Sequence, residues 1–336
     1  MLKLNQTRSL FIITALSGAT AFAEQPQYGE RLEGFKYRHE IKHFDFNSQN
    51  QNLSMGYMDV SPQVKSNGKT VVLLHGKNFC GATWERSITE LSEQGYRVIA
   101  PDQIGFCSSS KPRGYQFSFN QLAFNTQQLL KSLKIEQPIF IGHSMGGMLA
   151  TRYALNYPNA VKQLILVNPI GLEDWQEKGV PYATLDALYK NELKTTFESI
   201  KNYQLKFYYN QQWKPEYDKW VEMQAGLYTG SAKEIVAWNQ VQTADMLFNE
   251  PVLYGFKNLK VPTTLMIGMK DRTAPGSARA TAEIAKELGD YPNLSKEAVQ
   301  KIPQATLVPF DQLGHSPQIE SPVEFHKALF KVLAQP

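Results

Sequence analysis

A glycine-rich segment at residues 140–147, with the sequence FIGHSMGG, constrains this chain more strongly than any other stretch. The apolar run before it is short enough for a buried strand, and residues 145–157 have the apolar spacing of a helix. Ser144 stands between them in a Gly-x-Ser-x-Gly pattern, in which Gly142 and Gly146 allow the backbone to turn sharply. Such a strand-to-helix turn lifts the serine hydroxyl above the sheet. We therefore predict that Ser144 is a nucleophile.

The segments around this turn alternate between strand and helix patterns, which predicts a parallel sheet with helices on both faces. An earlier stretch alternates between polar and apolar residues and predicts an antiparallel pair, at 37–46 and 53–60, joined by a turn at 47–52. The other predicted strands are 70–74, 96–100, 137–141, 161–167, 263–268 and 306–310, and the predicted helices are 84–94, 118–133, 145–157, 277–288, 295–301 and 322–333.

The alternation stops between residues 171 and 256, where the chain is rich in tyrosine and tryptophan. Helix-like stretches at 185–205 and 214–227 predict a helical cap at 171–256, inserted into a core domain formed by residues 24–170 and 257–336. Most of the cap aromatics should hold it onto the core. A minority should face a cleft, because pockets between domains are usually lined by apolar and aromatic side chains.

The first residues have the features of a cleaved signal peptide at 1–23. Lys3 and Arg8 precede an apolar stretch at 10–16, and an Ala-Phe-Ala sequence predicts cleavage after Ala23. An uncleaved anchor is disfavoured because the apolar stretch is shorter than the about 20 residues that span a bilayer. We expect a periplasmic or secreted protein with no later membrane span.

The formal net charge is +4, and it falls to +2 without residues 1–23. Because the basic residues are scattered, the charge gives no reason to expect nucleic acid or an anionic membrane as a partner.

The two cysteines, Cys80 and Cys107, have no metal-ligand spacing, so we expect no metal site. Both follow neighbouring predicted strands, and an exported chain reaches an oxidising compartment, so a disulfide between them is feasible. Two unpaired thiols are the alternative.

A serine nucleophile needs a base and a group that orients the base. At a turn of this kind the chain order is serine, acid, histidine. Only His315 and His326 follow Ser144, and His326 falls inside the predicted helix at 322–333, whereas His315 follows the last strand. We predict His315 as the base.

The acid should also leave the end of a strand between Ser144 and His315. Asp271 does so directly after the strand at 263–268, and we predict it as the acid. Asp174 is the alternative, and Asp311 is too close to His315 in the chain.

An oxyanion hole requires two backbone N–H donors. We predict Met145, which follows the nucleophile, and Lys77 in the loop after the strand at 70–74, with Asn78 as the next choice. His75 should brace this loop, and the side chain of Lys77 should point into solvent, from where it could attract an anionic substrate group.

Taken together, these residues resemble the α/β-hydrolase superfamily over about residues 71–333. The resemblance implies a mostly parallel central sheet flanked by helices, an inserted helical cap, a Ser-His-Asp triad and no cofactor. The HGKNF sequence at 75–79, followed by Trp84, is similar to an exported bacterial subgroup whose members are mostly called hydrolases. Cys107 stands where the family often has glycine, which favours the disulfide. The resemblance is carried by His75-Gly76, Asp102, Gly105-Phe106, residues 142–147, Gly268 with Asp271, and Gly314-His315.

The resemblance also disfavours some activities. Haloalkane dehalogenases and epoxide hydrolases of this fold have aspartate at the position of Ser144, and proline iminopeptidases have HGGPG where this chain has HGKNF. We predict a cofactor-free serine hydrolase for carboxylic esters with apolar parts of modest size. The alternatives are a lactonase or carbon–carbon bond hydrolase with the same triad, and a non-catalytic binding module on this fold.

Overall fold

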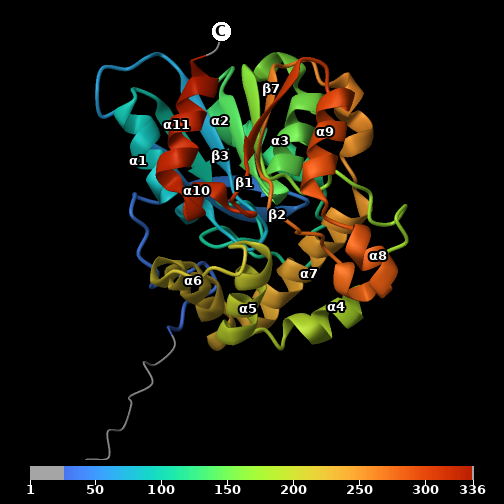
Figure 1. The fold of residues 1–336 in the computed structure, drawn as a ribbon. Helices are drawn as coiled ribbons and strands as arrows, with labels where there is room; N and C mark the ends of the chain where they lie inside the picture. The colour runs from blue at the N-terminus through green and yellow to red at the C-terminus, as the bar shows by residue number, and fades with distance from the viewer. Residues whose placement is uncertain (1–25, 335–336) are drawn as a thin grey trace, which may run out of the picture.

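A central eight-stranded sheet organises the molecule, with helices packed on both of its faces (Figure 1). The computed structural model describes residues 26–334, so the predicted signal peptide lies outside the described residues. The strand order is β1-β2-β4-β3-β5-β6-β7-β8. The strands are β1 (Lys42–Ser48), β2 (Gln51–Val60), β3 (Thr70–Leu74), β4 (Arg97–Pro101), β5 (Ile139–His143), β6 (Gln163–Val167), β7 (Thr263–Gly268) and β8 (Ala305–Phe310).

Strands β3 to β8 are all parallel to one another, whereas β2 pairs antiparallel with both β1 and β4. The β1–β2 connection is shorter than the predicted turn at 47–52. It consists of Gln49 and Asn50, both with positive φ (49° and 58°), as a two-residue hairpin turn requires. The predicted strand at 37–46 was also placed too early, since β1 begins at Lys42.

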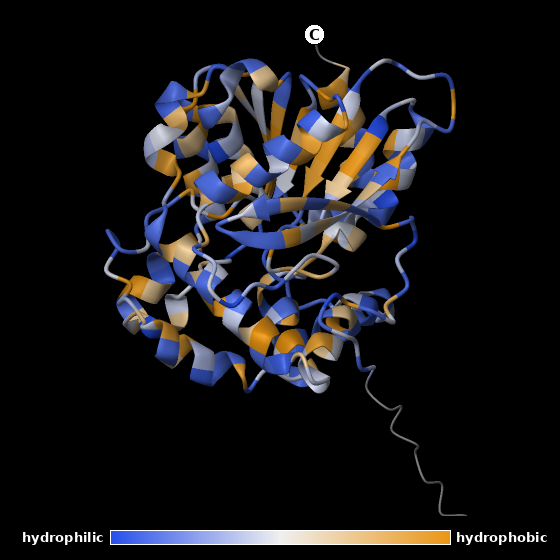
Figure 2. Cartoon of the chain, turned by 180° about the vertical axis from the view of Figure 1, so that it is seen from behind, coloured by the Kyte–Doolittle hydropathy of each residue, from blue (hydrophilic) through white to orange (hydrophobic). Residues whose placement is uncertain are grey.

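Alternate residues of each strand face two separate hydrophobic clusters, one on each side of the sheet. Val71 and Leu73 of β3 pack with α1 and α11, while Val72 and Leu74 pack with α2 and α3. Strands buried on both faces are near-continuous apolar runs, which Figure 2 shows as orange strands at the centre of the molecule. The flanking helices are α1 (Glu85–Glu93), α2 (Phe119–Ser132), α3 (Met145–Asn156), α9 (Tyr291–Lys301) and α11 (Pro322–Leu333).

Four helices between β6 and β7 gather beyond one end of the sheet (Figure 1). We call them the cap. The predicted continuous helix at 185–205 was wrong: it is broken at 193–196, where Thr196 forms a capping box with Ser199 and starts a new helix. The helix predicted at 214–227 begins later, at Asp218, and a further long helix follows it. The cap helices are α4 (Leu185–Glu192), α5 (Phe197–Phe207), α6 (Asp218–Thr229) and α7 (Lys233–Asn249).

The helix predicted at 277–288 was also wrong. A short 3-10 helix, Ser277–Arg279, is followed by α8 (Ala282–Glu287), because the Thr281 hydroxyl accepts a hydrogen bond from the Ile284 N–H and starts a new helix there. The helix predicted at 295–301 is instead the longer α9.

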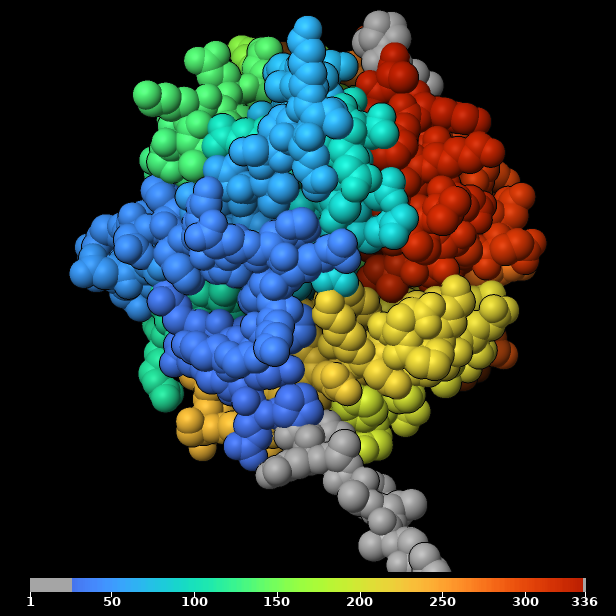
Figure 3. Space-filling model, turned by 90° about the vertical axis from the view of Figure 1, so that its left-hand side faces the viewer, coloured from blue at the N-terminus to red at the C-terminus, as the bar shows by residue number. Residues whose placement is uncertain are grey.

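The first described residues run against the cap. The Tyr28 N–H donates to the carbonyl of Gly226 in α6 (2.9 Å), and a Cβ at Gly226 would lie 2.3 Å from the Tyr28 ring. Figure 3 shows this N-terminal segment in blue beside the yellow cap helices. Within residues 26–334, no helix combines the length and apolar character needed to cross a membrane.

Cys80 and Cys107 form a disulfide between the loops that follow β3 and β4, with their Cα atoms 6.1 Å apart. Asp102 ties the same two loops together, because its carboxylate accepts from the N–H groups of Gly81 (2.7 Å) and Ser108 (3.0 Å). The bridge therefore lies beside the loop that begins at His75.

Candidate active site

Ser144 lies at a sharp turn between β5 and α3, with φ 56° and ψ −118°. A non-glycine residue rarely adopts positive φ, so the surrounding packing must hold it there. The two flanking glycines explain how the turn is possible. A Cβ at Gly142 would lie 2.3 Å from the carbonyl oxygen of Gly146, and one at Gly146 would lie 2.2 Å from the carbonyl oxygen of Leu74. Larger residues at either position would force this turn apart.

The carboxyl ends of four neighbouring parallel strands bring the predicted residues to one edge of the sheet. Ser144 follows β5, Asp271 follows β7 and His315 follows β8. Asn168 follows β6, which lies between the strands that carry Ser144 and Asp271. Ligands and catalytic groups of open α/β sheets gather at this edge.

Asp271 and His315 form a buried pair. His315 Nδ1 lies 2.6 Å from Asp271 Oδ2, and both side chains are fully buried. The carboxylate also accepts from the Thr273 N–H (2.7 Å) and from Asn168 Nδ2 (2.9 Å). These bonds fix the carboxylate, which in turn fixes the orientation of the imidazole.

Asn168 is a positioning residue that the sequence reasoning missed. Besides its bond to Asp271, its side chain accepts from the Gly268 N–H (2.9 Å), so it fastens the end of β6 to the end of β7. The available signal was its place directly after the strand predicted at 161–167, at the carboxyl edge of the sheet.

The other ring nitrogen of His315 remains free for Ser144. Nε2 is buried and has no hydrogen-bond partner among the described residues, and no hydrogen bond there uses Ser144 Oγ. Serine–histidine contacts are often loose without substrate and tighten in the complex. His143, the residue directly before Ser144, adds a restraint, because its Nε2 lies 2.8 Å from the His315 carbonyl oxygen. Burial holds the pKa of His143 well below its usual value, so its neutral ring donates this bond.

Two further residues hold the loop that carries His315. The Glu320 carboxylate accepts from the N–H groups of Gly314 (2.8 Å) and Ser316 (3.3 Å), on either side of the histidine. Tyr208, at the end of α5, accepts the His315 N–H with its carbonyl oxygen (3.0 Å), and the two rings lie 4.7 Å apart. The cap region thus contacts His315, the predicted base, directly.

Tyr208 also reaches the opposite side of the site. Asn78 Nδ2 donates to its hydroxyl (2.9 Å), so one cap residue joins the His315 loop to the loop after β3. Sequence reasoning placed the cap aromatics only in general terms and did not single out Tyr208.

The loop after β3 closely approaches Ser144, as the predicted oxyanion hole requires. A Cβ at Gly76 would lie 3.1 Å from Ser144 Cβ, which explains the glycine before Lys77. Met145 is the first residue of α3, where N–H groups have no partner inside the helix. Within residues 26–334, no backbone hydrogen bond uses the N–H of Lys77. Both predicted donors therefore have unused N–H groups.

The side chain of Lys77 does not point into solvent, and that prediction was wrong. Its ammonium donates to Gln240 Oε1 of α7 (3.0 Å), because the cap covers this loop. Burial lowers the pKa of Lys77, and the nearby charge of Glu192 opposes the shift.

The alternative residues have other contacts. Asp174 accepts from the N–H of Gln176 (2.9 Å) and from the Tyr254 hydroxyl (2.9 Å) in an exposed turn, and Asp311 is exposed. His326 is buried between α11 and α1, with its Nε2 2.9 Å from Ser87 Oγ. His75 braces its loop as we expected, since its Nε2 accepts from the Gln103 N–H (3.0 Å).

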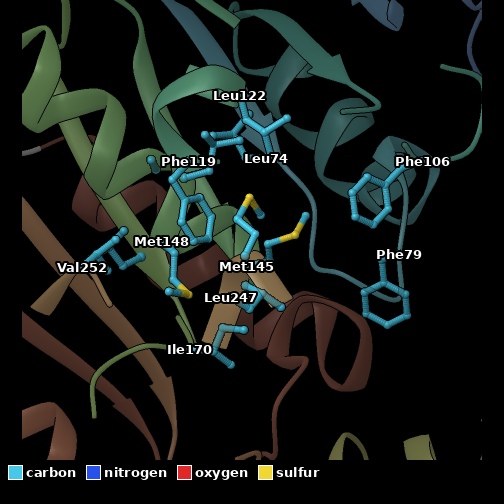
Figure 4. Packing of buried hydrophobic residues seen from close by; sticks show 14 of the residues in the cluster. Leu74, Phe79, Phe106, Phe119, Leu122, Met145, Met148, Ile170, Leu247 and Val252 are labelled. Atoms are coloured by element: carbon cyan, nitrogen blue, oxygen red, sulfur yellow. The ribbon is translucent and has the colours of Figure 1, made fainter. Parts of the chain in front are cut away.

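A cavity of about 360 Å³ opens at Ser144, between the sheet edge and the cap. Figure 4 shows part of the hydrophobic packing beside it, with Met145 and Met148 of α3 in the same cluster as Ile170 and Leu247. The aromatic residues of 171–256 contribute to the cavity, to the main hydrophobic core, or to both. The cavity is lined by Tyr182, Tyr203, Tyr208 and Phe248, of which Tyr208 and Phe248 also belong to the main core. The core residues that do not line this cavity include Trp175, Tyr209, Tyr217, Trp220 and Tyr228.

One group of possible metal ligands occurs among the described residues, formed by Cys80, Asp102 and Cys107. Its two sulfurs are joined to each other, so they do not act as thiolate ligands in this structure.

The fold and the carboxyl-edge site define an α/β-hydrolase. A family model for the alpha/beta hydrolase fold matches residues 69–322, and the chain belongs to this family. The predicted fold class is therefore confirmed.

Individual relatives are hydrolases as well. A probable hydrolytic enzyme from Pseudomonas aeruginosa PAO1 has a crystal structure that is 55% identical, covers 93% of this chain and 99% of its own, and superposes with a TM-score of 0.92. The AB hydrolase superfamily protein YisY of Bacillus subtilis is 26% identical over 74% of this chain and 85% of its own. Lipase 1 of Psychrobacter immobilis is 27% identical over 76% of this chain and 73% of its own.

Proposed function

We propose that this α/β-hydrolase is an exported serine hydrolase that cleaves carboxylic esters. The observation that carries the proposal is the buried Asp271–His315 pair, whose free Nε2 lies at the same sheet edge as the strained Ser144. The similarity to a lipase supports the choice of esters.

In the proposed reaction, His315 Nε2 takes the proton from Ser144 as Oγ attacks the acyl carbon. The N–H groups of Met145 and Lys77 hold the oxyanion, and Asp271 stabilises the imidazolium. His315 then donates its proton to the leaving alcohol. In the second half of the reaction, His315 takes a proton from water as the water oxygen attacks the acyl carbon, and it returns that proton to Ser144 Oγ as the acid leaves. No cofactor takes part in this scheme.

The cavity limits the substrate to a modest size, and the cap excludes bulk water from the acyl-enzyme. We propose export to the periplasm or the medium from the predicted signal peptide, and the disulfide suits an oxidising compartment.

Labelling of the purified mature chain with a fluorophosphonate, followed by peptide mapping, tests the proposal. We expect an adduct on Ser144 that is lost in His315→Ala, with p-nitrophenyl hexanoate hydrolysed by the wild type. A folded chain that forms no adduct and hydrolyses no ester would contradict the proposal and favour a non-catalytic binding module.

A further inference from the structure

The cavity at Ser144 has a polar end that the proposed reaction does not use. Lys77, Glu192 and Gln224 line this cavity, and Lys77 and Gln224 also line an adjoining one of about 20 Å³ together with Tyr228 and Gln240. We call these five residues the polar subsite. They come from the loop after β3 and from three cap helices, so they meet only when the cap is in place.

Lys77 has unused donors in the polar subsite. An ammonium group has three N–H bonds, and the bond to Gln240 Oε1 uses one of them. Within residues 26–334, no carboxylate lies within ion-pair distance of Lys77 Nζ. Because burying an ammonium without partners is costly, a bound oxygen acceptor would satisfy the remaining N–H groups.

Glu192 and Gln224 offer hydrogen-bond acceptors to the polar subsite. The Glu192 carboxylate accepts from the Tyr228 hydroxyl through Oε1, and no hydrogen bond among the described residues uses Oε2. The amide oxygen of Gln224 is buried and has no hydrogen-bond partner in this part of the chain. A bound N–H or O–H group would satisfy these acceptors.

These opposite needs select the charge of the ligand. An anion would be attracted by Lys77 but repelled by Glu192, and a cation would meet the reverse. An apolar chain would leave the Lys77 donors and the Gln224 acceptor unpaired. A neutral group with both an acceptor and a donor satisfies all three residues.

The position of the polar subsite indicates the part of the substrate that reaches it. The leaving oxygen must lie at His315 Nε2, and the His315 ring packs on Tyr208, His143 and Tyr291. The Lys77 side chain extends away from its own N–H along a four-carbon stem toward α7. On this geometry, the polar subsite is assigned to the acyl side of the scissile bond, away from the leaving oxygen.

We propose that the polar subsite binds a neutral secondary amide or hydroxyl group carried on the acyl chain of the substrate. This inference rests on the proposed ester hydrolysis and extends it, because it replaces a purely apolar acyl chain with one that is polar part of the way along. Lys77 donates to the oxygen of that group, and Gln224 and Glu192 accept from its N–H or O–H.

Four p-nitrophenyl esters with acyl chains of six or seven atoms test the inference: hexanoate, N-acetyl-β-alaninate, adipate and 6-aminohexanoate. Their kcat/KM values are measured for the wild type, Lys77→Met, Gln224→Leu and Lys190→Met. Lys190 is an exposed lysine of α4 that lies outside the cavity, so Lys190→Met is the matched control.

We expect the amide ester to be the best of the three polar esters, with adipate and 6-aminohexanoate each at least tenfold poorer. The ratio of kcat/KM for the amide ester to that for hexanoate should fall about tenfold in Lys77→Met and in Gln224→Leu, and stay unchanged in Lys190→Met. Gln224 lies outside the proposed oxyanion hole. A lower ratio in Gln224→Leu therefore reports recognition of the amide group and not a disturbance of the loop after β3.

Three results would overturn the inference. An unchanged ratio in both subsite variants, with hexanoate still hydrolysed, would show that the polar subsite does not recognise the amide group, but it would leave the proposed function intact. A preference for adipate over the amide ester would show that Lys77 selects an anion. Failure to hydrolyse any of the four esters would overturn the proposed function, and the inference with it.

Discussion

At the scale of single residues, the structure allows the two candidate acids to be compared directly. Asp271→Asn should lower kcat about 10³- to 10⁴-fold, because the amide cannot hold His315 in the required tautomer. Asp174→Asn is the matched control, since Asp174 accepts only from a surface turn and from Tyr254, and its kcat should stay within about twofold of the wild type. Steady-state hydrolysis of p-nitrophenyl hexanoate measures both. A small loss of kcat in Asp271→Asn together with a large loss in Asp174→Asn would show that the acid is misassigned.

A pair of neighbouring tyrosines gives a second comparison. Tyr208→Phe removes the hydroxyl that accepts from Asn78, so we expect kcat to fall about five- to tenfold with little change in KM, as the two loops lose their connection. Tyr209→Phe is the control, because the buried Tyr209 hydroxyl has no hydrogen-bond partner among the described residues.

Combining Tyr208→Phe with Asn78→Ala tests whether this effect acts through the hydrogen bond. The double variant should be little worse than either single variant, since all three lack the same bond. Fully additive losses in kcat, or an equal loss in Tyr209→Phe, would rule out this positioning role.

The sequence indicates some of these residues and not others for physical reasons. Ser144 belongs to a local motif whose glycines fix its own turn, so a short segment was enough to find it. Asn168 contacts Asp271 from a different strand, and that contact depends on strand order rather than on any local pattern. The side chain of Lys77 was misplaced because the cap that covers it comes from residues far along the chain.

At the scale of secondary-structure elements, the segment between β8 and α11 depends on the half-buried carboxylate of Glu320. Burial raises the pKa of Glu320 to about 7, although the hydrogen bonds that its carboxylate accepts from the N–H groups of Gly314 and Ser316 act to lower it. The folded chain therefore binds this proton more tightly than the unfolded chain, and stability falls as pH rises from about 4.5 to about 7.

Glu320→Gln should remove this dependence, since glutamine stays neutral and its amide oxygen can still accept from Gly314. We expect the free energy of unfolding of the variant, relative to the wild type, to rise by about 1 to 3 kcal/mol between pH 5 and pH 8. Urea unfolding at several pH values measures the difference. Glu324→Gln, an exposed change of the same chemistry in α11, is the matched control. Parallel pH curves for Glu320→Gln and the wild type would contradict the assignment.

The strands were easier to predict than the cap helices. Parallel strands buried on both faces are short apolar runs, and β3, β5 and β7 each consist largely of such a run. The stretch at 185–205 has continuous helical periodicity, yet the Thr196 side chain offers the backbone an alternative partner and a second helix begins there. Periodicity alone does not reveal such a break.

At the scale of the whole molecule, the active-site loops depend on long-range connections that form only in the complete fold. The loop after β3 is held by the disulfide to the loop after β4, by Asp102, and by the contacts of Lys77 and Asn78 with the cap. Changes to the disulfide should therefore affect both stability and catalysis.

The disulfide also connects the fold to the proposed export. The exported chain, denatured without reductant, should show no titratable thiol, and the same chain made in the cytosol without residues 1–23 should show two.

The bridge closes a loop with a sequence separation of 27 residues, so replacing both cysteines by serine should lower the free energy of unfolding by roughly 3 to 4 kcal/mol. Reductant should destabilise the wild type toward the same value and leave the double variant unchanged, because only the wild type has a bond to lose. Two free thiols in the exported chain, or a double variant as stable as the oxidised wild type, would contradict this role. If kcat falls together with stability, the bridge also positions the N–H of Lys77, since Cys80 lies only three residues beyond it.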